Sequence, residues 1–467
     1  MVYAILGILV ALAGGGLLAR HWVERRARRS VRALRREHRS RIDRFKRTSK
    51  TQIRQALFED EQVTAAVLAH MRETGESESA TWGKVHEYVE EIVPSFNLLS
   101  YYRLGYATAR LLVPLFYKVS VGYEAREALE AIPRNSVVLY LMNHRSNADY
   151  VVVAYVLSGQ VAISYAVGEW ARIWPLEAVF KSFGSYFVRR RFREALYHKI
   201  LERYVQIITQ NGVTQGIFLE GGLSRDGGFR EPKLGLLDYL IRIKRDPEFT
   251  RPLHIVPVAI NYDRVLEDRS LLREIQAPEE RLPRGQQVRE VASYVLKVST
   301  RFLLRRAKRY GRACVNFGAP LSVDAWLAEN PGVLDLPRDE RLARLKGLAD
   351  RVMASIAAVM PVTAVCLAAT ALLRHPGVRI SRLRWVEILN DLRSGLRGVG
   401  AHVIGDERES GEILDRALVM LTLRRLVTPE GDGFSIDRSQ DLVLRYYANA
   451  IAHFFKDRTA PLDPEQS

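Results

Sequence analysis

Cysteine is scarce in this sequence, since Cys314 and Cys366 are the only two among 467 residues. Neither stands in the paired spacing of a zinc site, and two cysteines exclude a disulfide framework. The count suits a reducing compartment. Disorder is excluded as well, because hydrophobic residues make up 48% of the chain, and the length allows two or more domains.

Two widespread catalytic motifs are also absent. No Gly-x-Ser-x-Gly elbow occurs, so a serine acyl-enzyme is not expected. No Gly-Lys-Ser or Gly-Lys-Thr follows a glycine-rich stretch, which excludes a P-loop. Without a serine nucleophile, a catalytic base of the chain would have to activate the substrate's own nucleophile, for which a hydroxyl is the natural candidate.

Charged residues are missing from Val2–Ala19, an apolar run of 18 residues. As a helix it would span about 27 Å, close to the roughly 30 Å of a bilayer core. No positive charge precedes the run, which argues against a cleaved signal peptide. We predict a transmembrane anchor at residues 1–20, with a buried helix as the alternative. The positive charge that follows would place the rest of the chain in the cytoplasm.

That positive charge is concentrated, because residues 20–50 contain 14 Lys or Arg and three acids in a chain of net charge +17. We predict a basic juxtamembrane helix at residues 21–50 that lies on an anionic membrane surface. Nucleic-acid binding is the rival interpretation, but Trp22 and Phe45 are the only aromatic residues available for base stacking. A solvated linking helix stays open.

The body of the chain divides into three predicted regions. Residues 51–120 form a helical N-terminal region, whose apolar stretch 97–118 either lies in a membrane interface or caps a core. From residue 136, apolar strand candidates alternate with helical stretches. The strand candidates are 136–142, 161–167, 185–189, 214–220, 254–260 and 313–318, and the helical stretches lie near 148–158, 191–210, 234–245 and 285–309.

This alternation predicts an α/β fold over residues 121–322, with a largely parallel sheet flanked by helices. Residues 323–467 show helical periodicity without a convincing strand pair, so we predict a helical C-terminal region. Ligands of parallel sheets bind beyond the carboxyl ends of the strands. Three of the strand candidates end there in polar residues.

The first of these ends is Asn-His-Arg-Ser-Asn-Ala-Asp, with His144 five positions before Asp149. Across a turn from strand to helix, the carboxylate could hold one ring nitrogen while the other acts as a general base. A structural hydrogen bond is the alternative, and the neighbouring loops favour catalysis. A second match, His38 to Asp43, lies in the basic run without an apolar pocket and is set aside.

The other two ends suit an anionic ligand. Arg189, Arg190 and Arg191 follow one strand candidate, and guanidinium groups match phosphate, although a solvated strand end is equally compatible. The loop from Glu220 to Gly228 combines glycines, whose backbone N–H groups can approach a ligand, with further donors. A plain surface loop is the alternative.

Four phrases resemble, in order and spacing, the four motifs of the glycerolipid acyltransferases. They are NHRSNAD, GSYFVRR, FLEGGLSR and IVPVAINYDRV. The likeness is closest to the membrane-bound glycerol-3-phosphate and dihydroxyacetone-phosphate acyltransferases. EPKLGLL, VNFGAPLS and LVLRYYANAIAHFF extend it, so that it covers residues 85 to 455. It identifies residues 121–322 as an acyltransferase domain.

The resemblance implies direct acyl transfer from acyl-CoA or acyl carrier protein to glycerol 3-phosphate, the first step of phospholipid synthesis. His144 would be the general base and Asp149 its orienting residue. The implied substrate-binding residues are Arg189, Arg190, Glu220, Gly221, Gly222, Ser224, Arg225, Lys233 and Pro257, the last of which would shape the acyl or phosphate pocket. No cofactor, metal or nucleic acid is implied. The expected location is the inner cell membrane, among its lipids, with the active site on the cytoplasmic face.

One residue departs from the family pattern, because Leu223 stands where the third motif usually has an arginine. In relatives that arginine is implicated in phosphate binding. Arg225, Arg230 or Lys233 could take over this role, or the acceptor could be dihydroxyacetone phosphate, a lysophospholipid or another alcohol. A non-catalytic scaffold that binds membranes or nucleic acid through residues 20–50 is the remaining alternative.

Overall fold

The structure is a computed structural model. It describes residues 50–94, 109–110, 113–114, 116–157, 163–168, 185–189, 192–276 and 310–455. The predicted anchor 1–20, the basic helix 21–50 apart from its last residue, and the helical stretch 285–309 lie outside these residues. Within the described part of the chain, no helix is long and apolar enough to cross a membrane.

The central element is an eight-stranded sheet, with strand order β1-β7-β6-β2-β5-β3-β4 and β8 paired to β6. Its strands are β1 Lys118–Tyr123, β2 Val137–Met142, β3 Ile163–Gly168, β4 Tyr186–Val188, β5 Thr214–Phe218, β6 Leu253–Tyr262, β7 Arg312–Phe317 and β8 Leu321–Ser322. From β6 to β4 all neighbouring strands are parallel, which confirms the predicted α/β class and the largely parallel sheet.

The sheet departs from a simple parallel arrangement next to β6, which also pairs antiparallel with β8. β7 runs antiparallel to β6, with Val258 opposite Phe317, and β1 runs parallel to β7 at the sheet edge. β1 was not among the strand candidates, because its sequence KVSVGY contains a glycine and its residues are largely half-exposed or exposed. Such an edge strand gives only a weak apolar signal.

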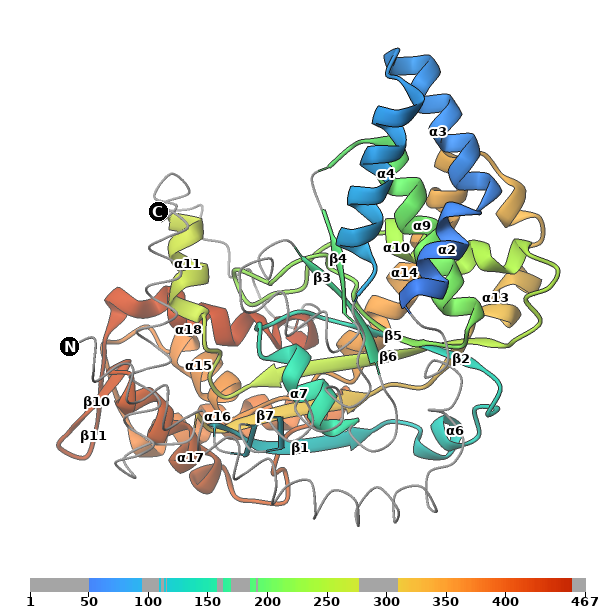
Figure 1. Ribbon diagram of the computed structural model, residues 1–467. Helices are drawn as coiled ribbons and strands as arrows, with labels where there is room; N and C mark the ends of the chain where they lie inside the picture. Colours follow the sequence, from blue (N-terminus) through green and yellow to red (C-terminus); the bar gives the residue numbers. More distant parts are fainter. Residues whose placement is uncertain are drawn as a thin grey trace, which may run out of the picture.

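Side chains of β2 point alternately to two layers of helices. Val137, Leu139 and Leu141 join one hydrophobic cluster, and Val138, Tyr140 and Met142 join another. The first layer contains α2 Lys50–Phe58, α3 Glu61–Thr74, α4 Glu78–Ile92, α9 Ala195–Gln210, α10 Gly235–Ile241, α13 Val323–Glu329 and α14 Arg338–Ala358. In Figure 1, α2, α3 and α4 (blue) stand beside α9 and α10.

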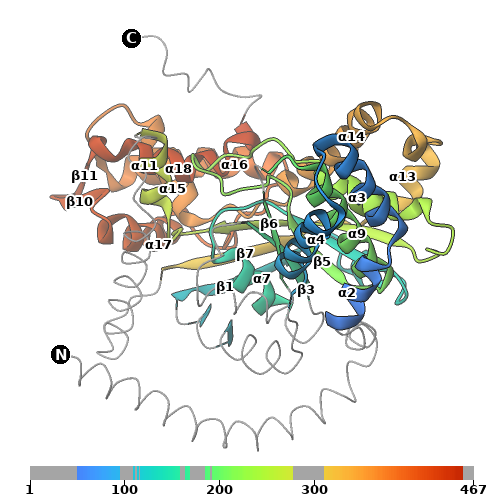
Figure 2. The same ribbon diagram turned by 45° about the horizontal axis from the view of Figure 1, so that its top comes forward.

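The second layer contains α7, which follows β2, and the C-terminal helices. Its members are α7 Asp149–Val156, α11 Asp268–Gln276, α15 Ala364–Arg374, α16 Arg382–Gly398, α17 Ser410–Leu423 and α18 Asp441–Asn449. Figure 2 shows α15, α16, α17 and α18 (orange to red) gathered on the opposite side of the molecule from α2–α4 (blue). The C-terminal region therefore shares its hydrophobic core with the sheet.

The C-terminal region is not purely helical, so the expectation of no strand pair there was wrong. β9 Arg379–Ser381, β10 Val427–Glu430 and β11 Gly433–Ile436 form a three-stranded antiparallel sheet in the order β10-β11-β9. These strands are only three or four residues long, Pro429 lies within β10, and β11 begins with Gly433. Strands this short show no apolar alternation in a sequence.

Candidate active site

The turn after β2 is fixed to the neighbouring strand β6 by its first residue. The Asn143 side-chain amide donates to the Ile260 carbonyl at 3.0 Å, and the Ile260 backbone N–H donates to Asn143 Oδ1 at 2.7 Å. Both bonds are buried, where they are protected from competition by water. The polar turn therefore starts from a rigid position at the carboxyl end of the parallel strands.

His144 and Asp149 meet across this turn, as their spacing predicts. His144 Nδ1 lies 2.9 Å from Asp149 Oδ2, which also accepts the backbone N–H groups of Arg145 and Ser146 at 2.7 and 3.0 Å. The side chain of His144 is 1% exposed and that of Asp149 is fully buried. Because the carboxylate faces Nδ1, it favours the tautomer in which Nε2 can accept a proton.

Tyr262, at the end of β6, binds the other oxygen of the same carboxylate. Its hydroxyl donates to Asp149 Oδ1 at 2.5 Å, and burial raises the pKa of Tyr262 well above its usual value, so the hydroxyl stays protonated. The His144 ring stacks on Phe218, with centroids 3.9 Å apart and an interplanar angle of 19°. Hydrogen bonds and stacking together fix the orientation of the imidazole.

A second carboxylate, Glu267, holds the middle of the turn. The Ser146 hydroxyl donates to Glu267 Oε2 at 2.6 Å, and the Asn147 backbone N–H donates to Oε1 at 3.2 Å. Burial raises the pKa of Glu267 above its usual range, against these two hydrogen bonds. Glu267 lies just after β6, so two segments far apart in the sequence shape the His144 turn.

The glycine-rich loop after β5 lies against the same turn. The Ser224 backbone N–H donates to the His144 carbonyl at 2.8 Å, and the Lys233 N–H donates to the Leu219 carbonyl at 2.7 Å. Gly221 has a φ of +66°, and a Cβ there would lie 2.7 Å from Lys233 Cγ. The structure thus brings the predicted residues Gly221, Ser224 and Lys233 close to the His144 turn or to the loop that contacts it.

Glu220 is a buried carboxyl group at the start of this loop. Its residue is 1% exposed, and Oε2 has no hydrogen-bond partner among the described residues. Burial raises the pKa of Glu220 to about 8, although the positive charges of Arg145 and Arg230 oppose this shift. Near neutral pH the group is therefore largely protonated and can donate a hydrogen bond.

Arg145 links the turn to the C-terminal region, a role that the sequence did not suggest. Its Nη1 donates to the Gly227 carbonyl, and its guanidinium group lies 4.8 Å from the ring centroid of Tyr446 in α18. The Tyr446 hydroxyl donates back to the Arg145 carbonyl at 3.3 Å. The phrase around Tyr446 was part of the resemblance, but only the fold reveals that it reaches the His144 turn.

Arg189 follows β4 and is paired within the fold. Its Nε donates to both carboxylate oxygens of Glu91 in α4, at 2.8 and 3.0 Å, and its Nη2 donates to Glu91 as well. The rings of Tyr88, Phe192 and Tyr197 surround the guanidinium group. Its contacts are therefore with α4 and α9, and the adjacent Arg190 lies outside the described residues.

The remaining predicted residues have different environments. Arg225 is exposed and forms an ion pair of 3.4 Å with Glu274. Gly222 is buried in the loop. Pro257 lies inside the sheet, opposite Leu141, and accepts the Gly318 backbone N–H at 2.9 Å. It lies five positions before Tyr262 and thus within the strand rather than at its carboxyl end.

Two protein families match this chain, one over residues 126–261 and the other over residues 290–459. Residues 126–261 match the family described as acyltransferase, and this range includes the His144 turn. Residues 290–459 match the glycerol-3-phosphate acyltransferase C-terminal region. The predicted resemblance to the glycerolipid acyltransferases is therefore confirmed.

Individual relatives agree with this assignment. A glycerol-3-phosphate acyltransferase of Actinobacillus succinogenes is 28% identical over 416 residues, which cover 86% of this chain and 49% of the relative. One of Aeromonas hydrophila is 27% identical over 413 residues, with 85% and 49% covered. The chain spans about half the length of the curated relatives it matches.

One solved structure is also similar. The crystal structure of the 1-acyl-sn-glycerophosphate acyltransferase of Thermotoga maritima aligns with 65% of this chain and 95% of its own. The TM-score is 0.30 and the identity is 16%.

Proposed function

We propose that the protein transfers a fatty acyl group from acyl-CoA or acyl carrier protein to the hydroxyl of glycerol 3-phosphate, the first step of phospholipid synthesis. The observation that carries this proposal is the buried His144–Asp149 pair at the carboxyl end of β2, inside the acyltransferase domain. The names of the relatives point to the same acceptor.

In the proposed mechanism, Asp149 holds the Nδ1 proton of His144, and Nε2 removes the proton of the acceptor hydroxyl. The alkoxide oxygen attacks the thioester carbonyl, and the carbon–sulfur bond then breaks as the tetrahedral intermediate collapses. The departing thiolate takes the proton from His144, which returns to its neutral form. A general base of this kind contributes about 10²–10⁴-fold to the rate.

The phosphate of the acceptor would bind on the glycine-rich loop. Lys233 and Arg225 are exposed cations of this segment, and Gly221, Gly222 and Ser224 provide small residues that allow a close approach. Protonated Glu220 could donate to a hydroxyl or phosphate oxygen. Arg189 could contribute only through its Nη1 side or after Glu91 releases it, because Nε and Nη2 already donate to Glu91.

A different acceptor, dihydroxyacetone phosphate or a lysophospholipid, is the second candidate, and one observation bears on the choice of acceptor. Leu223 is partly buried and packs against the hydrophobic cluster that contains α18. It offers no donor to a phosphate where the family usually has an arginine. Arg230, whose Nη1 donates to the Leu223 carbonyl at 3.1 Å, is a nearby cation that could replace it.

We also propose that the enzyme acts at the inner cell membrane with its active site on the cytoplasmic face. The uncharged run Val2–Ala19 and the basic segment 20–50 support this location. There, a soluble acceptor and donor would meet the lipid product. Pro257 would then influence the acyl pocket through the shape of the sheet beneath it.

The test is thioester consumption by the purified protein with palmitoyl-CoA or palmitoyl-acyl carrier protein. Glycerol 3-phosphate, dihydroxyacetone phosphate and lysophosphatidic acid are supplied in turn, to wild type, to His144→Ala and to the control His86→Ala, which removes an exposed histidine of α4. Turnover with glycerol 3-phosphate that only His144→Ala abolishes is expected. Turnover with another acceptor alone would establish the alternative, and none with any pair would refute acyl transfer.

A further inference from the structure

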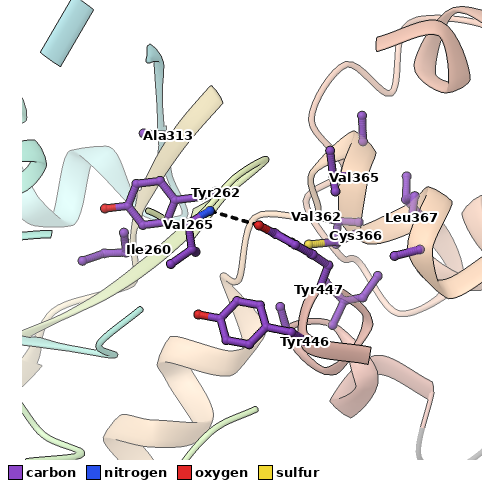
Figure 3. Packing of buried hydrophobic residues seen from close by; sticks show 14 of the residues in the cluster. Ile260, Tyr262, Val265, Ala313, Val362, Val365, Cys366, Leu367, Tyr446 and Tyr447 are labelled. Atoms are coloured by element: carbon purple, nitrogen blue, oxygen red, sulfur yellow. Dashed lines mark hydrogen bonds between the residues drawn. The ribbon is translucent and has the colours of Figure 1, made fainter. Parts of the chain in front are cut away.

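Tyr262 is a buried tyrosine whose hydroxyl has a specific acceptor in the active site. Its ring packs in a hydrophobic cluster with Ile260, Val265 and Ala313, and Figure 3 shows these side chains around it. Leaving a hydroxyl unpaired in such surroundings would be unfavourable. The hydroxyl instead reaches Asp149 Oδ1 at 2.5 Å, so the apolar cluster delivers one polar atom to the carboxylate.

The two oxygens of Asp149 have different sets of donors. Oδ2 faces His144 Nδ1 and two backbone N–H groups, whereas Oδ1 receives the Tyr262 hydroxyl. Donors on both oxygens prevent the carboxylate from rotating away from the imidazole. Tyr262 is itself held in place, because β6 pairs with β7 at this position and its ring contacts Tyr117 at a centroid distance of 5.3 Å.

We propose that Tyr262 is a positioning residue for acyl transfer, whose hydroxyl both holds Asp149 against His144 and limits the basicity of the His144 imidazole. This inference rests on the proposed function. It also adds a third side chain to the pair that the sequence motif suggests, and this residue comes from a strand more than a hundred positions further along the chain.

The effect on basicity follows from charge. A hydrogen bond to Oδ1 draws negative charge toward that oxygen, so Oδ2 stabilises a protonated imidazole less strongly. His144 then stays neutral, and able to accept a proton, down to a lower pH. The hydroxyl remains a donor throughout this range, because burial keeps the pKa of Tyr262 well above its usual value.

Other ionisable groups surround the pair and would be unchanged in a Tyr262 variant. Glu267 binds the turn itself, and Glu220, Arg145 and Tyr446 are close enough to interact electrostatically with one another or with Asp149. Substitution of Tyr262 by phenylalanine removes only the hydroxyl and keeps the ring. A change in the titration of His144 can then be assigned to the lost hydrogen bond.

The experiment compares wild type, Tyr262→Phe and the matched control Tyr117→Phe. Tyr117 contacts the Tyr262 ring, but its hydroxyl donates to the Arg264 carbonyl at 3.0 Å rather than to Asp149. For each protein, NMR follows the titration of the His144 ring, and steady-state kinetics give kcat, the KM for the acceptor and the pH profile of kcat/KM. The NMR measurement does not require activity.

We expect Tyr262→Phe to lower kcat by about ten-fold or more, as the loss of a hydrogen bond to a charged group would, with the acceptor KM unchanged. The His144 titration and the acid limb of kcat/KM should move to higher pH by roughly half a unit or more. Tyr117→Phe should match wild type. A His144 titration in Tyr262→Phe that stays in place or moves to lower pH would overturn the proposal.

The experiment also remains decisive if wild type is inactive or if Tyr262→Phe does not fold. If wild type transfers no acyl group, the proposed function fails, and the NMR titration alone decides whether Tyr262 restrains His144. If Tyr262→Phe does not fold, 3-fluorotyrosine is incorporated at position 262, because it has nearly the same shape and is a stronger donor. The His144 titration must then move to lower pH, and the absence of this movement would overturn the proposal.

Discussion

The backbone N–H of Ser224 donates to the carbonyl oxygen of His144 at 2.8 Å. This bond joins two loops that follow different strands, β2 and β5, at the carboxyl end of the sheet. Because both partners are main-chain atoms, this bond between the loops does not depend on the identity of either side chain. The proposed general base and the proposed phosphate-binding loop are therefore held together by a main-chain hydrogen bond.

The negative charge of Asp149, and not only its size, should be essential for activity. Asp149→Asn keeps the size of the side chain but removes the negative charge that favours the Nδ1–H tautomer of His144. We expect kcat to fall by roughly 10²–10⁴-fold with little change in the acceptor KM. Steady-state kinetics check this expectation. A loss confined to KM would assign Asp149 to substrate binding instead.

The contact between the glycine-rich loop and α18 should depend on Gly227. This residue has a φ of +87°, and a Cβ on it would collide with the Tyr446 carbonyl oxygen. Gly227→Ala should therefore destabilise the protein by about 2 kcal/mol or more and reduce activity, since the loop must move. The matched variant Gly228→Ala meets only the Asp226 side chain, at 3.6 Å, and should be nearly neutral in thermal unfolding.

If Gly227→Ala melts like Gly228→Ala, the loop can shift without cost and α18 does not restrain it. Asn449 of α18 provides a second link, because its side-chain amide donates to the Asp226 carbonyl at 3.0 Å. Asn449→Ala should then destabilise the Gly227→Ala variant by less than it destabilises wild type, because both substitutions weaken the same contact.

Much of the site could be predicted from the sequence because it consists of local features. The strand candidates that precede His144 and Glu220 end where apolar residues give way to polar ones, and this boundary is visible in the chain. Tyr262, Glu267 and Tyr446 could not be placed in the same way. Each contacts the His144 turn from more than a hundred positions away, and such a contact depends on strand order and helix packing.

Arg189 shows the opposite case, in which a local pattern was too general. Arginines after an apolar strand suit a phosphate, but they suit a carboxylate equally well, and the N-terminal helix α4 provides Glu91. Nothing in the sequence pairs Glu91 with a residue 98 positions later. The short strands β9, β10 and β11 were missed for a related reason, since their pairing partners rather than their own residues define them.

Glu91 should restrict the access of phosphate to Arg189. Glu91→Gln removes the charge that holds the guanidinium group, so we expect a lower KM for glycerol 3-phosphate together with a loss of stability of about 3 kcal/mol. Kinetics and chemical denaturation measure the two effects separately. The control is Glu87→Gln, since Glu87 is exposed and lies 3.6 Å from Arg189. If Glu91→Gln lowers the stability of the protein but leaves the KM for glycerol 3-phosphate unchanged, Arg189 does not bind the phosphate.

Glu220 should make the stability of the protein depend on pH. Burial raises the pKa of this carboxyl group from its usual 4.5 to about 8 in the folded state. Between these two values the unfolded chain has lost the proton and the folded chain keeps it, so folding takes up one proton. The contribution of Glu220 to the free energy of unfolding therefore decreases as the pH rises, by about 1.4 kcal/mol per unit in the middle of this window.

Glu220→Gln cannot ionise and should lack this decrease. The difference in unfolding free energy between the variant and wild type is expected to shift in favour of the variant from about pH 5 to about pH 8 and then to level off. Denaturation at a series of pH values measures it. The control Glu231→Gln changes an exposed carboxylate of the same segment, 82% exposed, and should give a flat difference. A flat difference for Glu220→Gln as well would mean that Glu220 is already ionised in the folded protein, which would leave its carboxylate as an acceptor rather than a donor to the substrate.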